Sequence, residues 1–266
     1  MLEVKSEKEP LAPPLLFIHG AWHGAWCWEP LMHHLAFRGL DSFALDLPGH
    51  GQVRERDPGG LGLEDYVAAV EAFVRGHLPE PPILVGHSMG GLIVQKYLET
   101  NRAPAAVLLG PCPATGASLT TLLKFSARYP ITGARVVFGR TLRVTTLGMC
   151  RRLFFHQVAP ENLRGLFHRL GPESTRALRQ MVLPGFKVRA ARIPSDIPVA
   201  VIAAGHDYFF PHKELEKWAR GYGYDFLSFP EAGHNLQSGP EYKQVGDRLS
   251  DWLEEKLGPG RFPPAA

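Results

Sequence analysis

The sequence predicts an α/β protein with a mostly parallel sheet that helices cover on both faces. Short apolar runs alternate along the chain with amphipathic segments, and glycine- or proline-rich turns separate the two kinds of segment. Continuous apolar runs are typical of parallel strands, because such strands are buried on both faces. Alternation of strands with helices of about ten or more residues is typical of this fold class. The 266 residues are enough for one domain with an insertion.

Clear breaks separate the elements of the first half of the chain. The turn-rich segment 46–51 stops one apolar run. Pro79, Pro81 and Pro82 close a segment in which apolar residues recur every three or four positions. In chain order, the expected elements are a strand at 15–18, a helix at 31–37, a strand at 42–45, a helix at 63–74, a strand at 83–85, a helix that ends at 99 and a strand at 105–109.

The alternation stops near residue 110 and returns near residue 198. The expected elements of the last part are strands at 198–204 and 226–229 and helices at 213–220 and 242–256. The interval 111–193 has helical patches but no clear buried strand. The expected division is therefore a core at 1–110 and 195–257, a cap insertion at 111–194 and a disordered tail at 258–266, whose prolines and glycines cannot bury a core.

The predicted cap is strongly basic. Between residues 118 and 192 there are 14 Lys and Arg residues and two acids, Glu161 and Glu173. This composition indicates either a solvated helical face or a surface that attracts anionic substrates or membranes.

Composition excludes several classes of protein. The formal net charge is +3 and the basic residues form no Lys/Arg blocks, so we expect no nucleic-acid partner. Cys27, Cys112 and Cys150 indicate buried free thiols rather than a disulfide framework. The N-terminus is charged, unlike a signal peptide, and no stretch approaches the roughly 20 apolar residues of a membrane span. We expect a cytoplasmic protein without a membrane partner; the sequence leaves its oligomeric state open.

The strand at 83–85 runs into Gly-His-Ser-Met-Gly at residues 86–90, which fits Gly-x-Ser-x-Gly between a strand and a helix. The chain must turn sharply there, and glycines on both sides of Ser88 avoid collisions in the bend. A glycine-rich helix start capped by Ser88 is an alternative, whereas the Gly-x-Gly-x-x-Gly fingerprint of a dinucleotide site is absent. The favoured interpretation makes Ser88 a nucleophile at the positive end of a helix.

A serine hydroxyl needs a base, and histidine has an ordinary pKa near the working range. Among the twelve histidines, His234 directly follows the last predicted strand. The carboxyl ends of parallel strands meet at one edge of the sheet, so His234 and Ser88 are expected at the same edge. His87, beside the nucleophile, is expected to point along the turn and to be structural.

The base in turn needs a carboxylate that fixes its tautomer. Asp207 follows the strand at 198–204 and gives the chain order Ser, Asp, His. Asp46 ends an earlier strand and is a back-up acid, whereas Asp196 and Asp225 precede strands and should lie at the opposite edge. The predicted catalytic residues are therefore Ser88, Asp207 and His234.

Acyl transfer develops negative charge on the carbonyl oxygen, which backbone N–H groups can stabilise. Met89, directly after the nucleophile, should supply one donor, and Ala21, in the loop after the first predicted strand, the other. Trp26 and Trp28 are expected in the core or the pocket wall. The residues expected to border the substrate are Trp22, His19, Gly20 and His87.

These motifs together resemble the α/β-hydrolase superfamily from about residue 15 to residue 257. His-Gly at 19–20, Asp-Leu-Pro-Gly-His-Gly at 46–51, Gly-His-Ser-Met-Gly-Gly at 86–91, Gly-His-Asp at 205–207 and Gly-His at 233–234 occur in the family's order. The opening His-Gly-Ala-Trp-His-Gly-Ala-Trp-Cys-Trp is similar to the methylesterase and hydroxynitrile lyase branch and its bacterial esterase relatives. The resemblance implies an α/β-hydrolase fold with a mainly helical cap. Only about 13 residues precede the first strand, so the antiparallel pair that opens many members should be short or missing.

The resemblance implies a serine carboxylesterase that acts on small to medium hydrophobic esters through an acyl-enzyme, with water as co-substrate and with no metal or organic cofactor. The lyases carry Thr after the first His and Lys after the catalytic His, where this chain has Gly20 and Asn235, so cyanohydrin cleavage is disfavoured. Carbon–carbon bond hydrolysis, perhydrolysis of the haloperoxidase type and a non-catalytic ligand-binding role stay open.

Overall fold

The computed structural model describes the chain except residues 8–11, 54–56, 157, 184–185, 187 and 259–266. The α/β fold predicted from the sequence is confirmed: a seven-stranded sheet has the order β1-β3-β2-β4-β5-β8-β9, and only β1 runs antiparallel to its neighbour. Its strands are β1 (Leu2–Val4), β2 (Leu15–Ile18), β3 (Ser42–Leu45), β4 (Ile83–His87), β5 (Ala106–Leu109), β8 (Val199–His206) and β9 (Asp225–Gly233).

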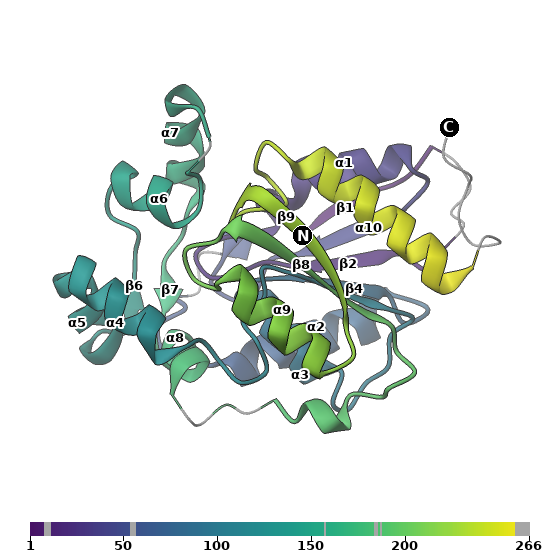
Figure 1. The fold of residues 1–266 in the computed structure, drawn as a ribbon, viewed down its shortest axis with the longest axis horizontal. Helices are drawn as coiled ribbons and strands as arrows, with labels where there is room; N and C mark the ends of the chain where they lie inside the picture. The colour runs from purple at the N-terminus through teal and green to yellow at the C-terminus, as the bar shows by residue number, and fades with distance from the viewer. Residues whose placement is uncertain (8–11, 54–56, 157, 184–185, 187, 259–266) are drawn as a thin grey trace.

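Helices cover both faces of this sheet, as expected for strands that are buried throughout. Helices α1 (Glu29–Phe37) and α10 (Tyr242–Leu257) pack together on one face. The opposite face carries α2 (Leu63–His77), α3 (Met89–Tyr97) and α9 (His212–Gly221) (Figure 1). Strands β2, β4 and β5 are buried at every residue and form the centre of the core.

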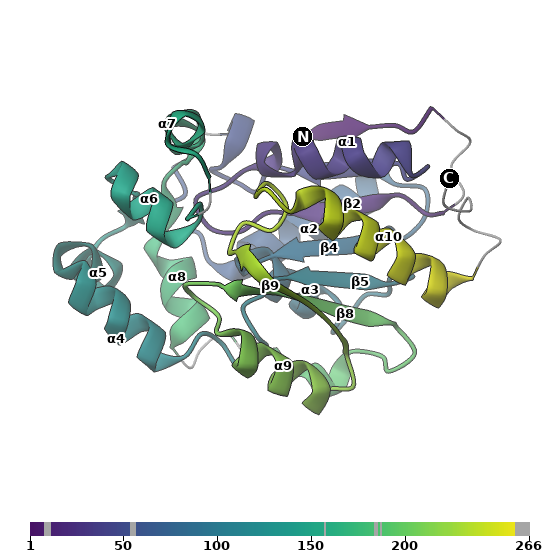
Figure 2. The same cartoon turned by 45° about the horizontal axis from the view of Figure 1, so that its top comes forward.

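The segment between β5 and β8 lies at one end of the sheet (Figure 2). It contains α4 (Leu119–Arg128), α5 (Pro130–Phe138), β6 (Thr141–Leu142), α6 (Leu147–Leu153), α7 (Pro160–Arg169), β7 (Glu173–Ser174), α8 (Thr175–Val182) and a short 3₁₀ turn at Ala190–Arg192. We call this segment, residues 111–194, the cap; its boundaries and the division into core and cap stay a prediction. The predicted tail at 258–266 lies outside the described residues except for Gly258.

The structure adds a short strand at the N-terminus and corrects the sequence prediction in the cap. At the N-terminus, β1 pairs antiparallel with β3 over three residues, so the opening antiparallel part of the sheet is short, as expected, and is not missing. In the cap, where no clear buried strand was predicted, β6 and β7 form a small antiparallel sheet and both residues of β7 are buried. Apolar patterning predicts neither strand, because β1 has only three residues and β7 is Glu-Ser.

Two smaller expectations, on the cysteines and on two tryptophans, agree with the structure. Cys27, Cys112 and Cys150 are free and buried. Trp26 and Trp28 belong to the core, with 8% and 0% of their surface exposed. In the described part of the chain, no helix has the length and apolarity that a bilayer crossing requires.

Candidate active site

Strand β4 delivers Ser88 into a strained turn. Ser88 has φ 54° and ψ −118°, outside the regions that residues with side chains ordinarily adopt, at a cost of about 1–3 kcal/mol. Backbone hydrogen bonds hold it there: its N–H donates to the Leu109 carbonyl at 3.0 Å, and its carbonyl accepts from the N–H groups of Gly91 and Cys112, both at 3.0 Å. The turn expected at the Gly-x-Ser-x-Gly motif is therefore present, with Ser88 at its apex.

The glycines of the motif are required by close backbone contacts. A Cβ atom at Gly86 would lie 2.5 Å from the Gly90 carbonyl oxygen, and a Cβ atom at Gly90 would overlap the carbonyl oxygen of Ile18 in β2. Both obstacles are backbone atoms, so a side chain cannot be accommodated by a change of rotamer.

We expect Gly90→Ala to lose much of its stability for this reason. The variant should unfold with a penalty of about 3 kcal/mol or more, which lowers the midpoint of thermal unfolding by about 6–12 °C in a chain of this size. Gly148→Ala is the matched control, because a Cβ atom there meets nothing within 4 Å. It should unfold at or slightly above the wild-type temperature. Equal midpoints for the two variants, measured by calorimetry, would contradict the close approach.

His234 and Asp207 form a hydrogen-bonded pair, as the sequence predicted for the base and its acid. His234 Nδ1 donates to Asp207 Oδ2 at 2.8 Å, and the two side chains are 1% and 0% exposed. The other oxygen, Oδ1, accepts from the N–H groups of Phe209 at 2.7 Å and Phe210 at 3.0 Å. Because a carboxylate only accepts, the neutral imidazole carries its proton on Nδ1 and leaves Nε2 free to take another.

An irregularity between β8 and β9 brings this pair together. The register shifts between Ala204 and His206, after which His206 lies opposite Gly233. The residue directly after each strand is a catalytic candidate, Asp207 after β8 and His234 after β9.

Ser88 and His234 line the same pocket. In the part of the chain that the structure describes, no hydrogen bond joins the Ser88 hydroxyl to the imidazole, so this contact stays a prediction. Catalytic hydrogen bonds are often long in ligand-free enzymes and tighten when substrate binds. Asp46, the back-up acid, is elsewhere: its carboxylate accepts from the N–H of Ala25 at 2.7 Å and from that of Gln52 at 3.3 Å.

The two expected oxyanion donors are the amides of Ala21 and Met89. Met89 begins α3, and Ala21 lines the pocket. Gly20 brings the Ala21 loop against the nucleophile, since a Cβ atom at Gly20 would lie only 2.9 Å from the Cβ atom of Ser88. Among the described residues neither amide donates to another protein group, which leaves both available for a ligand oxygen.

The residues expected around the substrate divide into two groups. Trp22 and His87 line the pocket, whereas His19 and Gly20 are absent from its described lining. The His19 ring contacts backbone groups. Its Nδ1 donates to the Gly20 carbonyl at 2.8 Å, and its Nε2 accepts from the N–H of Leu47 at 3.1 Å. Burial lowers the pKa of His19 to about 3, so it stays neutral and fixes the loop.

His87 does not compete with His234 as a base. Its Nε2 donates to the His234 carbonyl at 2.9 Å, and its Nδ1 accepts from Gln237 at 3.4 Å. Burial lowers the pKa of His87 well below its ordinary value. Both ring nitrogens are therefore occupied, and the structural role expected for His87 is compatible with these contacts.

His23 is a pocket residue that the sequence interpretation missed. Its Nδ1 donates to the Ala21 carbonyl at 2.8 Å, and its Nε2 accepts from the amide of Asn235 at 2.9 Å. Burial lowers its pKa to about 4, so a neutral His23 connects the Ala21 loop to the residue after His234. The opening motif at 19–28 includes His23 but does not indicate this role, because the role depends on a partner 212 positions away.

The pocket wall is almost entirely apolar, and much of it comes from the cap. No Lys, Arg, Asp or Glu belongs to its described lining, so the basic residues of the cap lie elsewhere. Phe154, Phe209 and Phe210 have ring centroids 6.1, 4.9 and 5.9 Å from that of His234. The lining residues are Ala21, Trp22, His23, His87, Ser88, Ala117, Thr121, Leu122, Phe125, Val136, Leu142, Phe154, Leu178, Met181, Val182, Phe209, Phe210 and His234. Within the described residues, no group of three or more His, Cys, Asp or Glu side chains is arranged to hold a metal ion.

Curated relatives match part of the chain. The chain is 36% identical to the probable esterase PIR7A of Oryza sativa subsp. indica over 118 residues, which are 42% of this chain and 45% of that protein. It is 39% identical to protein phosphatase methylesterase 1 of Bos taurus over 105 residues, which are 38% of this chain and 27% of that protein. These matches span less than half the length of the relatives.

Solved structures match nearly the whole fold. A methylesterase protein, MES16, from Arabidopsis superposes with a TM-score of 0.70 and 19% identity, over 92% of this chain and 100% of that one. An extracellular α/β-hydrolase from a Paenibacillus species gives a TM-score of 0.72 and 18% identity, over 92% of this chain and 99% of that one. At this level of identity the likeness shows the fold.

The family model described as "Alpha/beta hydrolase family" matches residues 15–242, from β2 to the start of α10. The match includes the Ser88 turn, the cap, Asp207 and His234, and it confirms the resemblance seen in the sequence motifs. The chain belongs to the alpha/beta hydrolase family.

Proposed function

We propose that this chain is a serine-dependent carboxylic ester hydrolase that acts through an acyl-enzyme on small to medium hydrophobic esters. The observation that carries the proposal is the His234–Asp207 pair, which faces the same apolar pocket as the strained Ser88. Esterase and methylesterase names among the relatives support the same reaction class.

The proposed reaction has two steps. Ser88 Oγ attacks the ester carbonyl while His234 Nε2 takes the hydroxyl proton, and the same proton then passes to the departing alcohol. Water next attacks the acyl-enzyme, gives a proton to Nε2 and releases the acid as Ser88 recovers its proton. Asp207 stabilises the imidazolium in both steps, and the Ala21 and Met89 amides bind the oxyanion.

Cyanohydrin cleavage, another activity found in this branch of the family, is less well supported by the residues present. Cyanohydrin cleavage needs a cation near the departing cyanide, but the residue after His234 is Asn235, whose amide is bonded to His23. Carbon–carbon bond hydrolysis and perhydrolysis use the same three side chains, so the activity assays should include substrates for both reactions in addition to esters.

The apolar lining predicts a preference for uncharged acyl groups. We expect kcat/KM for 4-nitrophenyl pentanoate to exceed that for mono-4-nitrophenyl glutarate by about 100-fold or more, because the described lining of the pocket offers no Lys or Arg to a buried carboxylate. The two acyl chains have equal length, so length cannot explain a difference. A preference for the glutarate would instead support the interpretation of the basic cap as an anion-attracting surface.

A fluorophosphonate probe separates an enzyme from a ligand-binding member of the family. An activated Ser88 should be labelled in the folded protein and protected by a slowly hydrolysed ester. The proposed function would be refuted if the protein were unlabelled and hydrolysed neither of the two 4-nitrophenyl esters.

A further inference from the structure

Trp22, the residue after the proposed oxyanion donor Ala21, has an unusual backbone conformation. Its φ is 65°, and among the described residues other than glycine only Ser88 shares a positive φ. A bulky residue in this region costs about 1–3 kcal/mol and persists only where its surroundings enforce it. The contacts that enforce it at Trp22 come from the cap.

Three hydrogen bonds tie Trp22 to the cap. The indole Nε1 donates to the Leu142 carbonyl in β6 at 3.0 Å, and the Trp22 carbonyl accepts from the N–H of Gly171 at 2.8 Å. The Trp22 N–H donates to Glu173 Oε2 in β7 at 3.2 Å. The peptide between Ala21 and Trp22 is thus held by Glu173 through its N–H and by His23 through its carbonyl, one peptide unit from the Ala21 amide.

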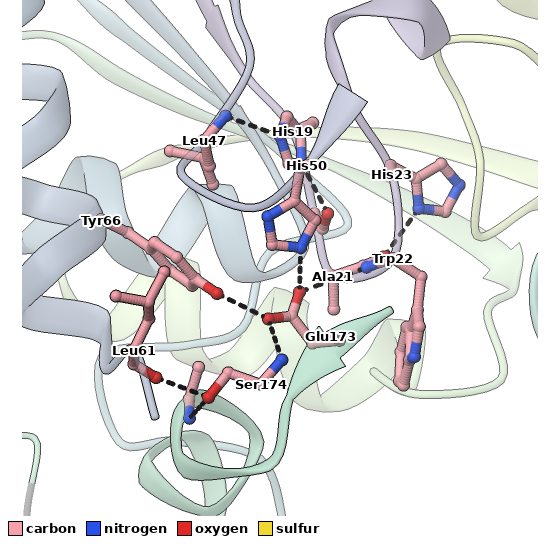
Figure 3. A network of polar contacts seen from close by, with 12 residues as sticks. His19, Ala21, Trp22, His23, Leu47, His50, Leu61, Tyr66, Glu173 and Ser174 are labelled. Carbon is pink, nitrogen blue, oxygen red and sulfur yellow. Dashed lines mark hydrogen bonds and ion pairs between the residues drawn. The ribbon is translucent and has the colours of Figure 1, made fainter. Parts of the chain in front are cut away.

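Glu173 is wholly buried and is the centre of a polar network that spans cap and core (Figure 3). Besides Trp22, Oε2 accepts from His50 Nε2 at 2.9 Å. Oε1 accepts from the Tyr66 hydroxyl at 2.8 Å and from the N–H of Ser174 at 2.7 Å. Four donors converge on one carboxylate, which is the pattern expected for a buried charge that has to be compensated.

The charge state of this network follows from its donors and acceptors. His50 Nδ1 lies 3.1 Å from the Pro48 carbonyl, and Nε2 faces the carboxylate, so both ring nitrogens face acceptors and both must carry a proton. Burial alone would lower the pKa of His50, but the Glu173 carboxylate raises it above its ordinary value. Burial would likewise raise the pKa of Glu173, but His50 lowers it. The pair is therefore an imidazolium and a carboxylate.

We propose that Glu173 is a positioning residue for the oxyanion hole: through the Trp22 N–H it fixes the strained loop that presents the Ala21 amide to the substrate. The inference rests on the proposed ester hydrolysis. It assigns to the cap a share in stabilising the transition state, beyond lining the pocket. Interactions that are stronger in the transition state than in the ground state change kcat and leave KM nearly unaltered.

Glu173→Gln tests the proposal by removing the charge while keeping the shape. Without the carboxylate, a neutral His50 keeps its proton on Nδ1 for Pro48 and presents Nε2 as an acceptor. The new amide NH₂ turns toward that nitrogen, and the Trp22 N–H loses its acceptor. We expect kcat to fall by about 10-fold or more, less than the 10²–10³ lost with a whole oxyanion donor, and KM to stay within about 2-fold.

Tyr66→Phe is the matched control. It removes another donor from the same carboxylate but leaves the contact between Trp22 and Glu173 in place. This variant should keep kcat within about 2-fold of wild type even if its thermal midpoint falls as far as that of the Gln variant. If both variants lose kcat in proportion to their stability, Glu173 is a structural residue and the proposal is wrong.

A transition-state analogue gives a second readout. Affinity for a trifluoromethyl ketone, which forms a tetrahedral adduct with Ser88, should fall in the Glu173→Gln variant in parallel with kcat, while affinity for an unreactive ketone of the same shape should not change. If the Gln variant does not fold, Glu173→Asp, which keeps the charge but shortens the side chain that accepts from the Trp22 N–H, should lower the ratio of the two affinities. Unchanged ratios would overturn the proposal.

Amide hydrogen exchange separates failure of this inference from failure of the proposed function. Peptides that cover residues 20–24 should exchange faster in the Gln variant than in wild type or in Tyr66→Phe, whether or not the protein hydrolyses esters. Equal exchange in all three proteins would refute the proposal that Glu173 fixes this loop through the Trp22 N–H. If the wild-type protein has no esterase activity but the three proteins differ in exchange as expected, the proposed reaction is refuted, while the contact between Glu173 and the Trp22 N–H is supported.

Discussion

Ser88→Ala should reduce kcat/KM for short 4-nitrophenyl esters by at least about 10⁴-fold, because the acyl-enzyme cannot form without the hydroxyl. The remaining rate would come from substrate binding and from the oxyanion donors alone. The variant should also lose fluorophosphonate labelling. Initial rates at several protein concentrations, corrected for uncatalysed hydrolysis, measure the effect.

Folding must be checked in the same experiment, because Ser88 occupies a strained turn. Its three backbone hydrogen bonds do not involve the side chain, so the Ala variant should keep the wild-type circular dichroism spectrum and pocket. Ser195→Ala, at an exposed position outside the pocket lining, is the control and should retain full activity. Wild-type turnover by a correctly folded Ser88→Ala protein would exclude Ser88 as the nucleophile.

The central part of the fold could be predicted because its strands are buried on both faces. Strands β2 and β3 coincide with the predicted 15–18 and 42–45, and β4 and β8 extend two residues beyond the predicted ends. Those additional residues are Gly86-His87 and Gly205-His206, which lie beyond the predicted ends of the apolar runs. Hydrophobicity alone cannot find the end of a strand whose last residues are polar and held by their neighbours.

The cap illustrates a different limit of prediction from sequence. Strand β7 consists of Glu173 and Ser174, both fully buried, and was counted in the sequence only as part of a basic, solvated-looking segment. Its burial is possible because His50 and Tyr66 compensate the carboxylate from 123 and 107 positions away. A buried charge whose partners are distant in sequence leaves no local pattern, so this contact had to be observed.

The proposed triad could be predicted because it depends on topology more than on local packing. Three residues that directly follow three strands must meet at one edge of a parallel sheet, and the structure places Asp207 and His234 in hydrogen-bond contact there. The wall of the pocket follows no such rule. Phe154 comes from the end of α6 in the cap, and no spacing in the sequence relates it to His234.

Asp207→Asn should lower kcat by about 10³–10⁴-fold with little change in KM, although it replaces one oxygen by nitrogen. Asp207 Oδ1 accepts from two backbone N–H groups, those of Phe209 and Phe210, so the carbonyl oxygen of Asn must stay on that side. Its NH₂ group then faces His234 Nδ1, which becomes an acceptor. The imidazole proton moves to Nε2, the nitrogen that has to receive the proton of Ser88, and general-base catalysis is lost.

Asp46→Asn separates this effect from a general loss of carboxylates. Asp46 was the alternative acid, and its carboxylate accepts from the backbone N–H groups of Ala25 and Gln52 rather than from a histidine. Its replacement should reduce stability but leave kcat within about 3-fold of wild type. If Asp46→Asn inactivated the protein and Asp207→Asn did not, the acid that orients His234 would have to be Asp46, the residue after β3. The hydrogen bond at 2.8 Å between His234 and Asp207 would then be a structural contact, because a base that works without its orienting carboxylate does not depend on that carboxylate for its tautomer.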